Sequence, residues 1–238
     1  MYILSFHIRK NILNPDNENL INNHIVKYIS LTHIELANYQ QLSEIKKRNV
    51  LESNTIAITS QNAAIWLVNN LTSWRGVIYT NSTKTECILQ QMPNVKTHVS
   101  NHSYAKNLGL LIQKSKVKSF IHLTGNLGLN DLSEMAVNND INYQRLEVYS
   151  TQLTPKPCNL SLINVCIFTS PSQVVSFFKV NTWKKSIFAL CIGKTTAKQL
   201  EQHGVPTPNI YYPQKANYLA MLELLPEIEN KIEQQKTK

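Results

Sequence analysis

Gly193-Lys194-Thr195-Thr196 is the stretch whose residue types most directly suggest binding chemistry. An apolar run over 186–192, typical of a buried strand, precedes it, and helix-forming residues with apolar spacing follow at once. The first turn of a helix has backbone N–H groups without partners and the positive end of the helix dipole, and both favour a carboxylate or a phosphate. We therefore expect an anion to bind where this strand passes into this helix.

Nucleotide phosphate is not the anion that this stretch predicts. A P-loop needs a glycine five residues before Gly193, and the chain has Phe188 there, inside the predicted strand. The four cysteines are scattered along the chain, so neither a zinc site nor a disulfide framework is indicated. Lys194 is therefore interpreted as part of a site for another anion, with no metal.

Composition indicates a soluble protein with an anionic partner. No segment of the 238 residues approaches the roughly 20 apolar residues of a membrane-spanning helix. The first residues lack the features of a signal peptide, so we expect a cytoplasmic protein without a membrane partner. Lys and Arg outnumber Asp and Glu by 24 to 15, a formal charge of +9, which favours nucleic acid, an acidic membrane surface or a small polyanion. Charge alone does not choose among these three.

Strand and helix patterns alternate along the chain. We expect strands at 2–8, 24–36, 55–60, 76–80, 95–99, 119–124, 142–153, 165–169, 186–192 and 209–212. Helices are expected at 61–71, 81–91, 103–113, 130–138, 171–179 and 194–203, with a closing helix from 216 to about 233 that breaks at Pro226. This alternation predicts an α/β fold with parallel sheets flanked by helices.

The residues at the strand–helix junctions recur, which indicates an internal repeat. Thr59-Ser60-Gln61 returns as Thr169-Ser170-Pro171, and Asn81-Ser82-Thr83 returns as Gly193-Lys194-Thr195. The offsets are 170 − 60 = 110 and 195 − 83 = 112. We therefore expect two similar lobes joined by a two-stranded linker. The predicted lobes are a discontinuous domain of 1–32 plus 154–238 and an inserted domain of 37–146, with 33–36 and 147–153 as the linker strands.

Ligands of open parallel sheets bind beyond the carboxyl ends of the strands. This rule predicts a cleft between the lobes along which Ser60, Thr83, Gly125, Ser170 and Thr195 lie.

Four segments, taken together and in order, resemble the uroporphyrinogen-III synthase family. They are Leu146–Thr151, Ile167–Ser172, Ile192–Ala197 with Leu200 and Gly204 following, and Gly125-Asn126 ahead of a Leu-rich helix. The resemblance implies a lyase that removes water from hydroxymethylbilane and closes the macrocycle with the last pyrrole ring inverted. It also implies a two-lobed α/β fold, no cofactor, and a small polycarboxylate tetrapyrrole as the substrate.

The resemblance also implies roles for individual residues. Tyr149 matches the family's Val-Tyr-x-Thr tyrosine and is the candidate proton donor to the departing hydroxyl. The substrate-binding candidates are residues at strand ends and helix starts: Ser60, Thr83, Gly125, Asn126, Ser170, Pro171, Ser172, Lys194, Thr195 and Thr196. Purely structural roles are the alternative, because a tyrosine at a strand end commonly packs locally and Ser or Thr commonly caps a helix.

Two rival functions remain open from the sequence. A catalytically inactive two-lobed protein of the same fold could bind an anionic ligand. Nucleic-acid binding rests on net charge alone, and the chain lacks the interleaved aromatic and basic residues of such a surface. The preferred hypothesis is the enzyme, acting as a monomer without nucleic acid.

Overall fold

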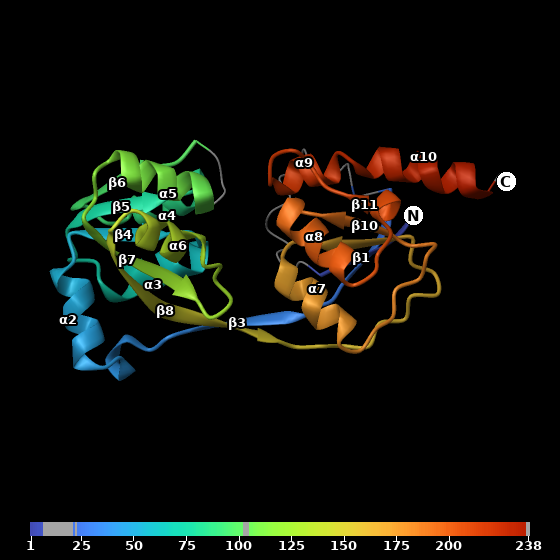
Figure 1. Cartoon of the computed structure of the whole chain (residues 1–238). Helices are drawn as coiled ribbons and strands as arrows, with labels where there is room; N and C mark the ends of the chain where they lie inside the picture. Colours follow the sequence, from blue (N-terminus) through green and yellow to red (C-terminus); the bar gives the residue numbers. More distant parts are fainter. Residues whose placement is uncertain (7–20, 22, 102–104, 237–238) are drawn as a thin grey trace. The chain divides into compact units, whose positions relative to one another are not determined.

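The computed structural model describes residues 1–6, 21, 23–101 and 105–236, and within them the chain forms two compact units. Unit 1 comprises Met1–His33 and Gln152–Lys238, and unit 2 comprises Ile34–Thr151. Each unit has its own sheet and its own helices (Figure 1). The predicted α/β fold with two parallel-dominated sheets is confirmed.

Unit 2 is built on a six-stranded sheet of order β3-β8-β7-β4-β5-β6. Its strands are β3 (Thr32–Leu36), β4 (Thr55–Ile58), β5 (Gly76–Thr80), β6 (Val95–Val99), β7 (Ser119–Gly125) and β8 (Asn142–Leu153). All neighbours from β8 to β6 run parallel. The carboxyl ends of these five strands therefore meet at one edge of the sheet.

Helices cover both faces of this sheet. The helices are α2 (Glu44–Glu52), α3 (Gln61–Asn70), α4 (Thr83–Leu89), α5 (Ala105–Lys114) and α6 (Asp131–Asn138). Buried residues of α2, α3 and α4 pack with Ile56, Ile58 and Ile78 of the sheet on one face. Residues of α5 and α6 pack with Ala57 and Phe120 on the other. Successive strand residues alternate between the two apolar layers, as a doubly covered sheet requires.

Unit 1 is built on a five-stranded parallel sheet of order β11-β10-β9-β1-β2. Its strands are β1 (Tyr2–Ser5), β2 (Ile25–Tyr28), β9 (Val165–Phe168), β10 (Phe188–Cys191) and β11 (Ile210–Tyr211). Helices α7 (Pro171–Phe178) and α8 (Lys194–Gln202) pack on one face, and α9 (Tyr218–Leu222) and α10 (Leu225–Lys236) on the other. The first strand therefore pairs with a strand from the C-terminal half of the chain.

The predicted strand at 24–36 is in fact two strands in two different sheets. β2 pairs with β1, whereas β3 pairs with β8. Leu31, between them, is fully buried in the core of unit 1. A polar and apolar alternation does not show where a chain leaves one sheet for another, so the alternation over 24–36 predicts a single strand across this break.

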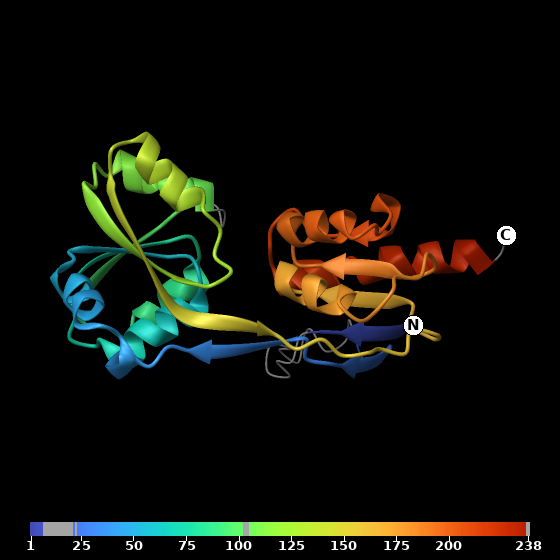
Figure 2. The same cartoon turned by 60° about the horizontal axis from the view of Figure 1, so that its bottom comes forward.

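The chain passes between the units along β3 and β8, which lie side by side (Figure 2). Thr154 N–H donates to Leu31 O at 2.9 Å, and Ala37 N–H donates to Val148 O at 2.9 Å. Because the residue numbers run in opposite directions along the pair, the two strands are antiparallel.

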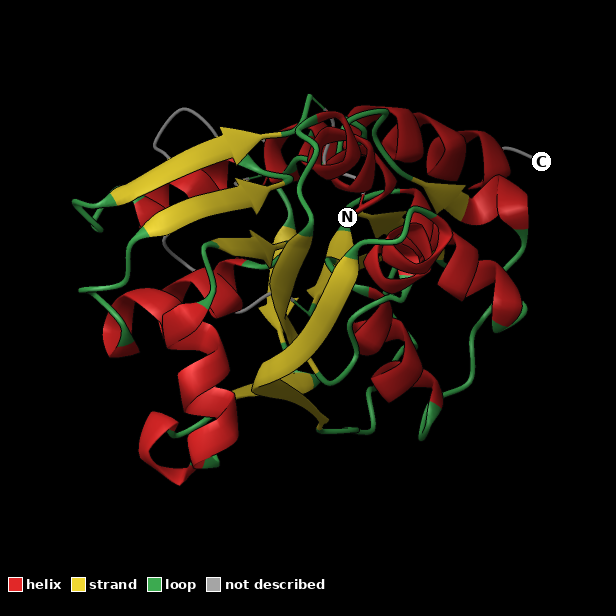
Figure 3. Ribbon diagram, turned by 60° about the vertical axis from the view of Figure 1, so that its left-hand side comes forward, coloured by secondary structure: helices red, strands yellow, loops and turns green. Residues whose placement is uncertain are grey.

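The internal repeat appears as equivalent helix starts at the ends of equivalent strands. Figure 3 draws the strands in yellow and the helices that flank them in red. Ser60 and Ser170 are the N-caps of α3 and α7, 110 residues apart. The next pair of N-caps is Ser82 and Gly193, 193 − 82 = 111 residues apart. The structural equivalent of Thr83 is therefore Lys194 and not Thr195, a shift of one residue from the predicted pairing.

Two predicted element ends also differ. The closing helix breaks between Leu222 and Leu225, and Pro226 is the second residue of α10, where a missing N–H costs nothing. The first strand ends at Ser5, and residues 7 and 8 of its predicted range lie outside the described residues, as do residues 103 and 104 of the predicted helix at 103–113. None of the described helices is long and apolar enough to cross a membrane.

Candidate functional site

In unit 2 the predicted site residues follow the carboxyl edge of the sheet. Thr83 comes after β5, Ser60 after β4, and Gly125 ends β7, while Tyr149 lies on β8. These four strands are neighbours in the order β5-β4-β7-β8, so the residues form a row along one edge. Ser60 caps α3 by accepting a hydrogen bond from Asn62 N–H at 3.2 Å.

Gly125 and Tyr149 are in direct contact. They are paired residues of β7 and β8, and a Cβ added to Gly125 would overlap the ring of Tyr149. No larger residue than glycine fits under this ring without a shift. The half-buried Tyr149 also packs against the core that α3 shares with the sheet.

A β-bulge determines the direction of Tyr149. Thr124 pairs with Glu147, but the next residue, Gly125, pairs with Tyr149, so Val148 is the extra residue. Without a bulge, residues two apart share a face, and Tyr149 would join Glu147. With it, Tyr149 packs on the same side as Leu146 and Val148. The sequence pattern of β8 does not reveal this change of face.

Asn126 begins a turn that is bound to β8. Its backbone N–H donates to Tyr149 O at 3.3 Å, its Oδ1 accepts from Thr151 N–H at 2.8 Å, and its Nδ2 donates to Thr151 O at 3.4 Å. Asn126 therefore extends the pairing of β7 with β8 by one residue, through its backbone and its side chain. Both of its side-chain ends are occupied within the protein.

A polar group that sequence reasoning missed lies on the opposite face of the same strands. His122 is 2% exposed; its Nε2 lies 3.3 Å from Thr59 Oγ1, and its Nδ1 lies 3.2 Å from the hydroxyl of Tyr143. Burial and then the nearby Arg145 lower the pKa of His122 to about 4, so this imidazole is neutral at pH 7. The only sign of this group in the sequence is that His122 and Arg145 lie within predicted strands, at 119–124 and 142–153.

In unit 1 the predicted residues lie beyond β9 and β10, which are neighbours in the sheet. Ser170 caps α7, accepting from Gln173 N–H at 3.3 Å, and its hydroxyl lies 2.9 Å from that of Ser172. Pro171 occupies the first helical position. The buried Gln173 binds the ends of two strands, since its Oε1 accepts from Thr169 N–H at 2.7 Å and its Nε2 donates to Phe6 O at 3.1 Å.

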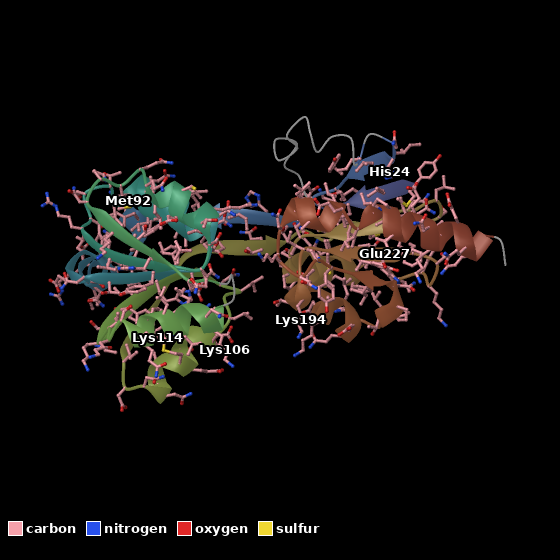
Figure 4. The ribbon with its side chains drawn as sticks, turned by 90° about the horizontal axis from the view of Figure 1, so that it is seen from above. His24, Met92, Lys106, Lys114, Lys194 and Glu227 are labelled. Atoms are coloured by element: carbon pink, nitrogen blue, oxygen red, sulfur yellow. The ribbon has the colours of Figure 1, made fainter. Side chains whose placement is uncertain are left out.

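The start of α8 presents Lys194 and Thr195 to solvent, whereas Thr196 is 1% exposed. Figure 4 labels Lys194 at this helix start. Gly193 O accepts hydrogen bonds from the backbone N–H groups of Thr196 and Ala197, both at 3.1 Å. The first two N–H groups of the helix, those of Lys194 and Thr195, have no intrahelical acceptor and can face an anion. The Thr196 side chain, in contrast, is part of the core.

The structure thus brings Gly125, Asn126 and Tyr149 together in unit 2, and the Ser170–Ser172 and Lys194–Thr196 segments onto neighbouring strand ends in unit 1. Within the described parts of the chain, no group of three or more His, Cys, Asp or Glu residues is placed to hold a metal ion.

A family model described as uroporphyrinogen-III synthase HemD matches residues 24–223. The chain belongs to the uroporphyrinogen-III synthase family. This is a family of lyase-type enzymes of tetrapyrrole biosynthesis, and the matched range covers the strands and helices of both site edges.

Solved structures of the uroporphyrinogen-III synthase family share the fold of this chain. A structure of uroporphyrinogen-III synthetase from Helicobacter pylori is 21% identical, with a TM-score of 0.66 over 95% of this chain and 99% of that one. A mutant uroporphyrinogen III synthase from Thermus thermophilus is 14% identical, with a TM-score of 0.64 over 97% and 99% of the two chains. No individual curated protein sequence matches.

Proposed function

We propose that this protein is a uroporphyrinogen-III synthase, which converts hydroxymethylbilane to uroporphyrinogen III by a cyclising dehydration that inverts the last pyrrole ring. The observation that carries the proposal is the family match over residues 24–223. The row of candidate residues at the carboxyl edge of each sheet supports it.

The chemistry of the substrate suits these edges. A bilane carries an acetate and a propionate on every ring, so it is a polyanion. The exposed start of α8, with Lys194 and two N–H groups open to an anion, is suited to one of these carboxylates. A net charge of +9 on the chain favours the approach of such a substrate.

Tyr149 is proposed as the proton donor. Loss of the terminal hydroxyl creates an electrophilic azafulvene, and a phenol that donates a proton to the departing oxygen lowers the barrier to that loss. The ring of Tyr149 is held against Gly125, so the position of the hydroxyl is well defined.

Positioning is the larger part of the proposed catalysis. Ring closure without an enzyme gives the uninverted isomer I, so the protein must hold the bilane folded while the inverted ring closes. Ser60, Thr83, Gly125 and Asn126 in unit 2 are proposed to contact the substrate. The proposed contacts in unit 1 are Ser170, Pro171, Ser172, Lys194, Thr195 and the backbone of Thr196.

One assay tests the proposal. Freshly made hydroxymethylbilane is added to the protein, and the product isomers are separated after oxidation to porphyrins. We expect isomer III in excess, formed faster than the spontaneous reaction. Isomer I alone, at the spontaneous rate, would contradict the proposal and favour a binding protein of the same fold. The proposed monomeric state and cytoplasmic location are checked by light scattering and by cell fractionation.

A further inference from the structure

Arg145 of β8 binds the turn that carries the candidate site residues of unit 2. Its Nη2 donates to Gly125 O at 2.9 Å, and its Nη1 donates to Gly128 O at 3.1 Å. Nη2 also lies 3.4 Å from Glu147 Oε1, which orients the guanidinium from the same strand. One planar side chain thus spans two carbonyl groups of a single turn, which a lysine ammonium cannot reproduce.

The turn has little freedom to move away from this guanidinium. Gly128 N–H donates to Gly125 O at 3.0 Å, so Gly125 O accepts from both the turn and Arg145. A Cβ added to Gly128 would overlap Thr124 Oγ1. Asn126 binds the opposite side of the turn to Thr151 of β8. The turn is therefore held from both sides.

Through this turn Arg145 acts on Tyr149. The carbonyl group that Arg145 binds belongs to Gly125, and the same glycine contacts the ring of Tyr149. The bulge at Val148 places the two residues opposite each other. If Gly125 shifts, the surface on which the Tyr149 ring packs shifts with it.

We propose that Arg145 is a positioning residue that fixes the Gly125–Gly128 turn and, through Gly125, the hydroxyl of Tyr149. This inference rests on the proposed function of Tyr149. Arg145 acts on the protein and not on the substrate. Its 25% side-chain exposure also allows a direct contact with a substrate carboxylate, and the experiment separates these two roles.

The test uses Arg145→Lys and Arg145→Gln in the full chain. Positioning predicts that both variants lower kcat about tenfold while KM changes less than about threefold, because the lost geometry is needed only in the transition state. Isomer I also rises in both. If Arg145 instead holds a carboxylate, Lys keeps activity and Gln raises KM with kcat unchanged, which overturns the proposal.

A second measurement requires no substrate. In both variants, we expect amide hydrogen exchange of Asn126–Asn130 to accelerate about tenfold or more, while the amides of β4 and β5 stay protected. Unchanged exchange in this turn overturns the positioning role even if activity falls. The matched control is Arg75→Gln, since Arg75 is exposed at the opposite end of the sheet, and it should leave both readouts unchanged.

The two proposals fail in different ways. If the unaltered protein makes no isomer III, the proposed function fails, and the exchange measurement still reports whether Arg145 holds the turn. If the unaltered protein makes isomer III and both Arg145 variants keep its kcat and isomer ratio, the positioning proposal alone fails.

Discussion

At the scale of single residues, the Tyr149 hydroxyl can be tested apart from its ring. The ring packs against Gly125 and the core of unit 2, and Tyr149→Phe leaves both contacts in place. We expect kcat to fall about 10- to 100-fold, at the lower end of general acid effects, with an unchanged melting temperature. Initial rates with fresh hydroxymethylbilane provide the measurement.

A matched control for this substitution is Tyr212→Phe. Tyr212 is 42% exposed and lies after β11 of unit 1, so its hydroxyl should not affect turnover. An unchanged kcat for Tyr149→Phe would assign the donor role to a different group, such as bound water or a substrate carboxylate.

His122 predicts a pH dependence of stability. Its pKa is lowered to about 4 by burial and by Arg145, whereas an unfolded chain has a histidine pKa near 6.5. Between about pH 4 and pH 6.5, therefore, the unfolded state binds a proton at His122 and the folded state does not. The stability is complete above about pH 6.5 and falls as the pH drops to about 4, by on the order of 3 kcal/mol.

His122→Gln isolates this contribution. Glutamine can still bond to Thr59 or Tyr143 and does not titrate. We expect urea unfolding at pH 4.5 and pH 7.5 to show a smaller loss of stability in the variant than in the unaltered protein. Equal losses would mean that other groups dominate the acid sensitivity.

At the scale of elements, three of the serine N-caps, Ser60, Ser82 and Ser170, should differ in how much they stabilise the fold. Ser60 and Ser170 each accept a backbone hydrogen bond at a helix start, whereas the Ser82 side chain makes no capping bond. Ser60→Ala and Ser170→Ala should each lower the free energy of unfolding by about 1 kcal/mol, and Ser82→Ala by clearly less. Chemical denaturation measures all three, and an equal cost for Ser82→Ala would refute this account.

The same variants report on binding. If Ser170 contacts the substrate as well as capping α7, Ser170→Ala raises KM in addition to lowering stability. A change in stability with no change in KM would leave Ser170 with the capping role alone.

At the scale of the whole molecule, each unit has its own apolar layers. Leu67 of α3 is fully buried in unit 2, and Leu200 of α8 is fully buried in unit 1. Either leucine changed to alanine should cost about 2–5 kcal/mol. Because the two cores are separate, we expect amide exchange to accelerate mainly in the unit that carries the substitution.

This pair of variants also serves as its own control. Leu67→Ala should expose β4 and β5 to exchange, and Leu200→Ala should expose β9 and β10. Equal acceleration in both units, from either variant, would show that the two cores unfold as one.

The two sheets have the same spatial arrangement of strands, but these strands follow one another in a different order along the chain. The order β6-β5-β4-β7-β8 in unit 2 corresponds to β11-β10-β9-β1-β2 in unit 1. In unit 2 these strands follow one another along the chain, whereas in unit 1 the last two are supplied by the N-terminus. The repeat in the sequence therefore lies at the ends of β4 and β5 and of β9 and β10, which are strands that keep the same chain order in both units.

The sequence by itself determined most of the elements and the class of fold. β6 and β8 begin and end where their alternation predicted, and Ser60 and Ser170 cap helices as their position before an apolar helix indicated. These features depend on residues that are close together in the sequence, so local patterns are sufficient to predict them.

Only the tertiary structure decided which strands are neighbours and where side chains point. The separation of 24–36 into two sheets depends on Leu31 entering a core formed largely by residues beyond 157. The direction of Tyr149 depends on a bulge opposite Gly125, and the bonds of Arg145 reach residues 17 and 20 positions away. Such contacts join distant parts of the chain, and no local periodicity records them.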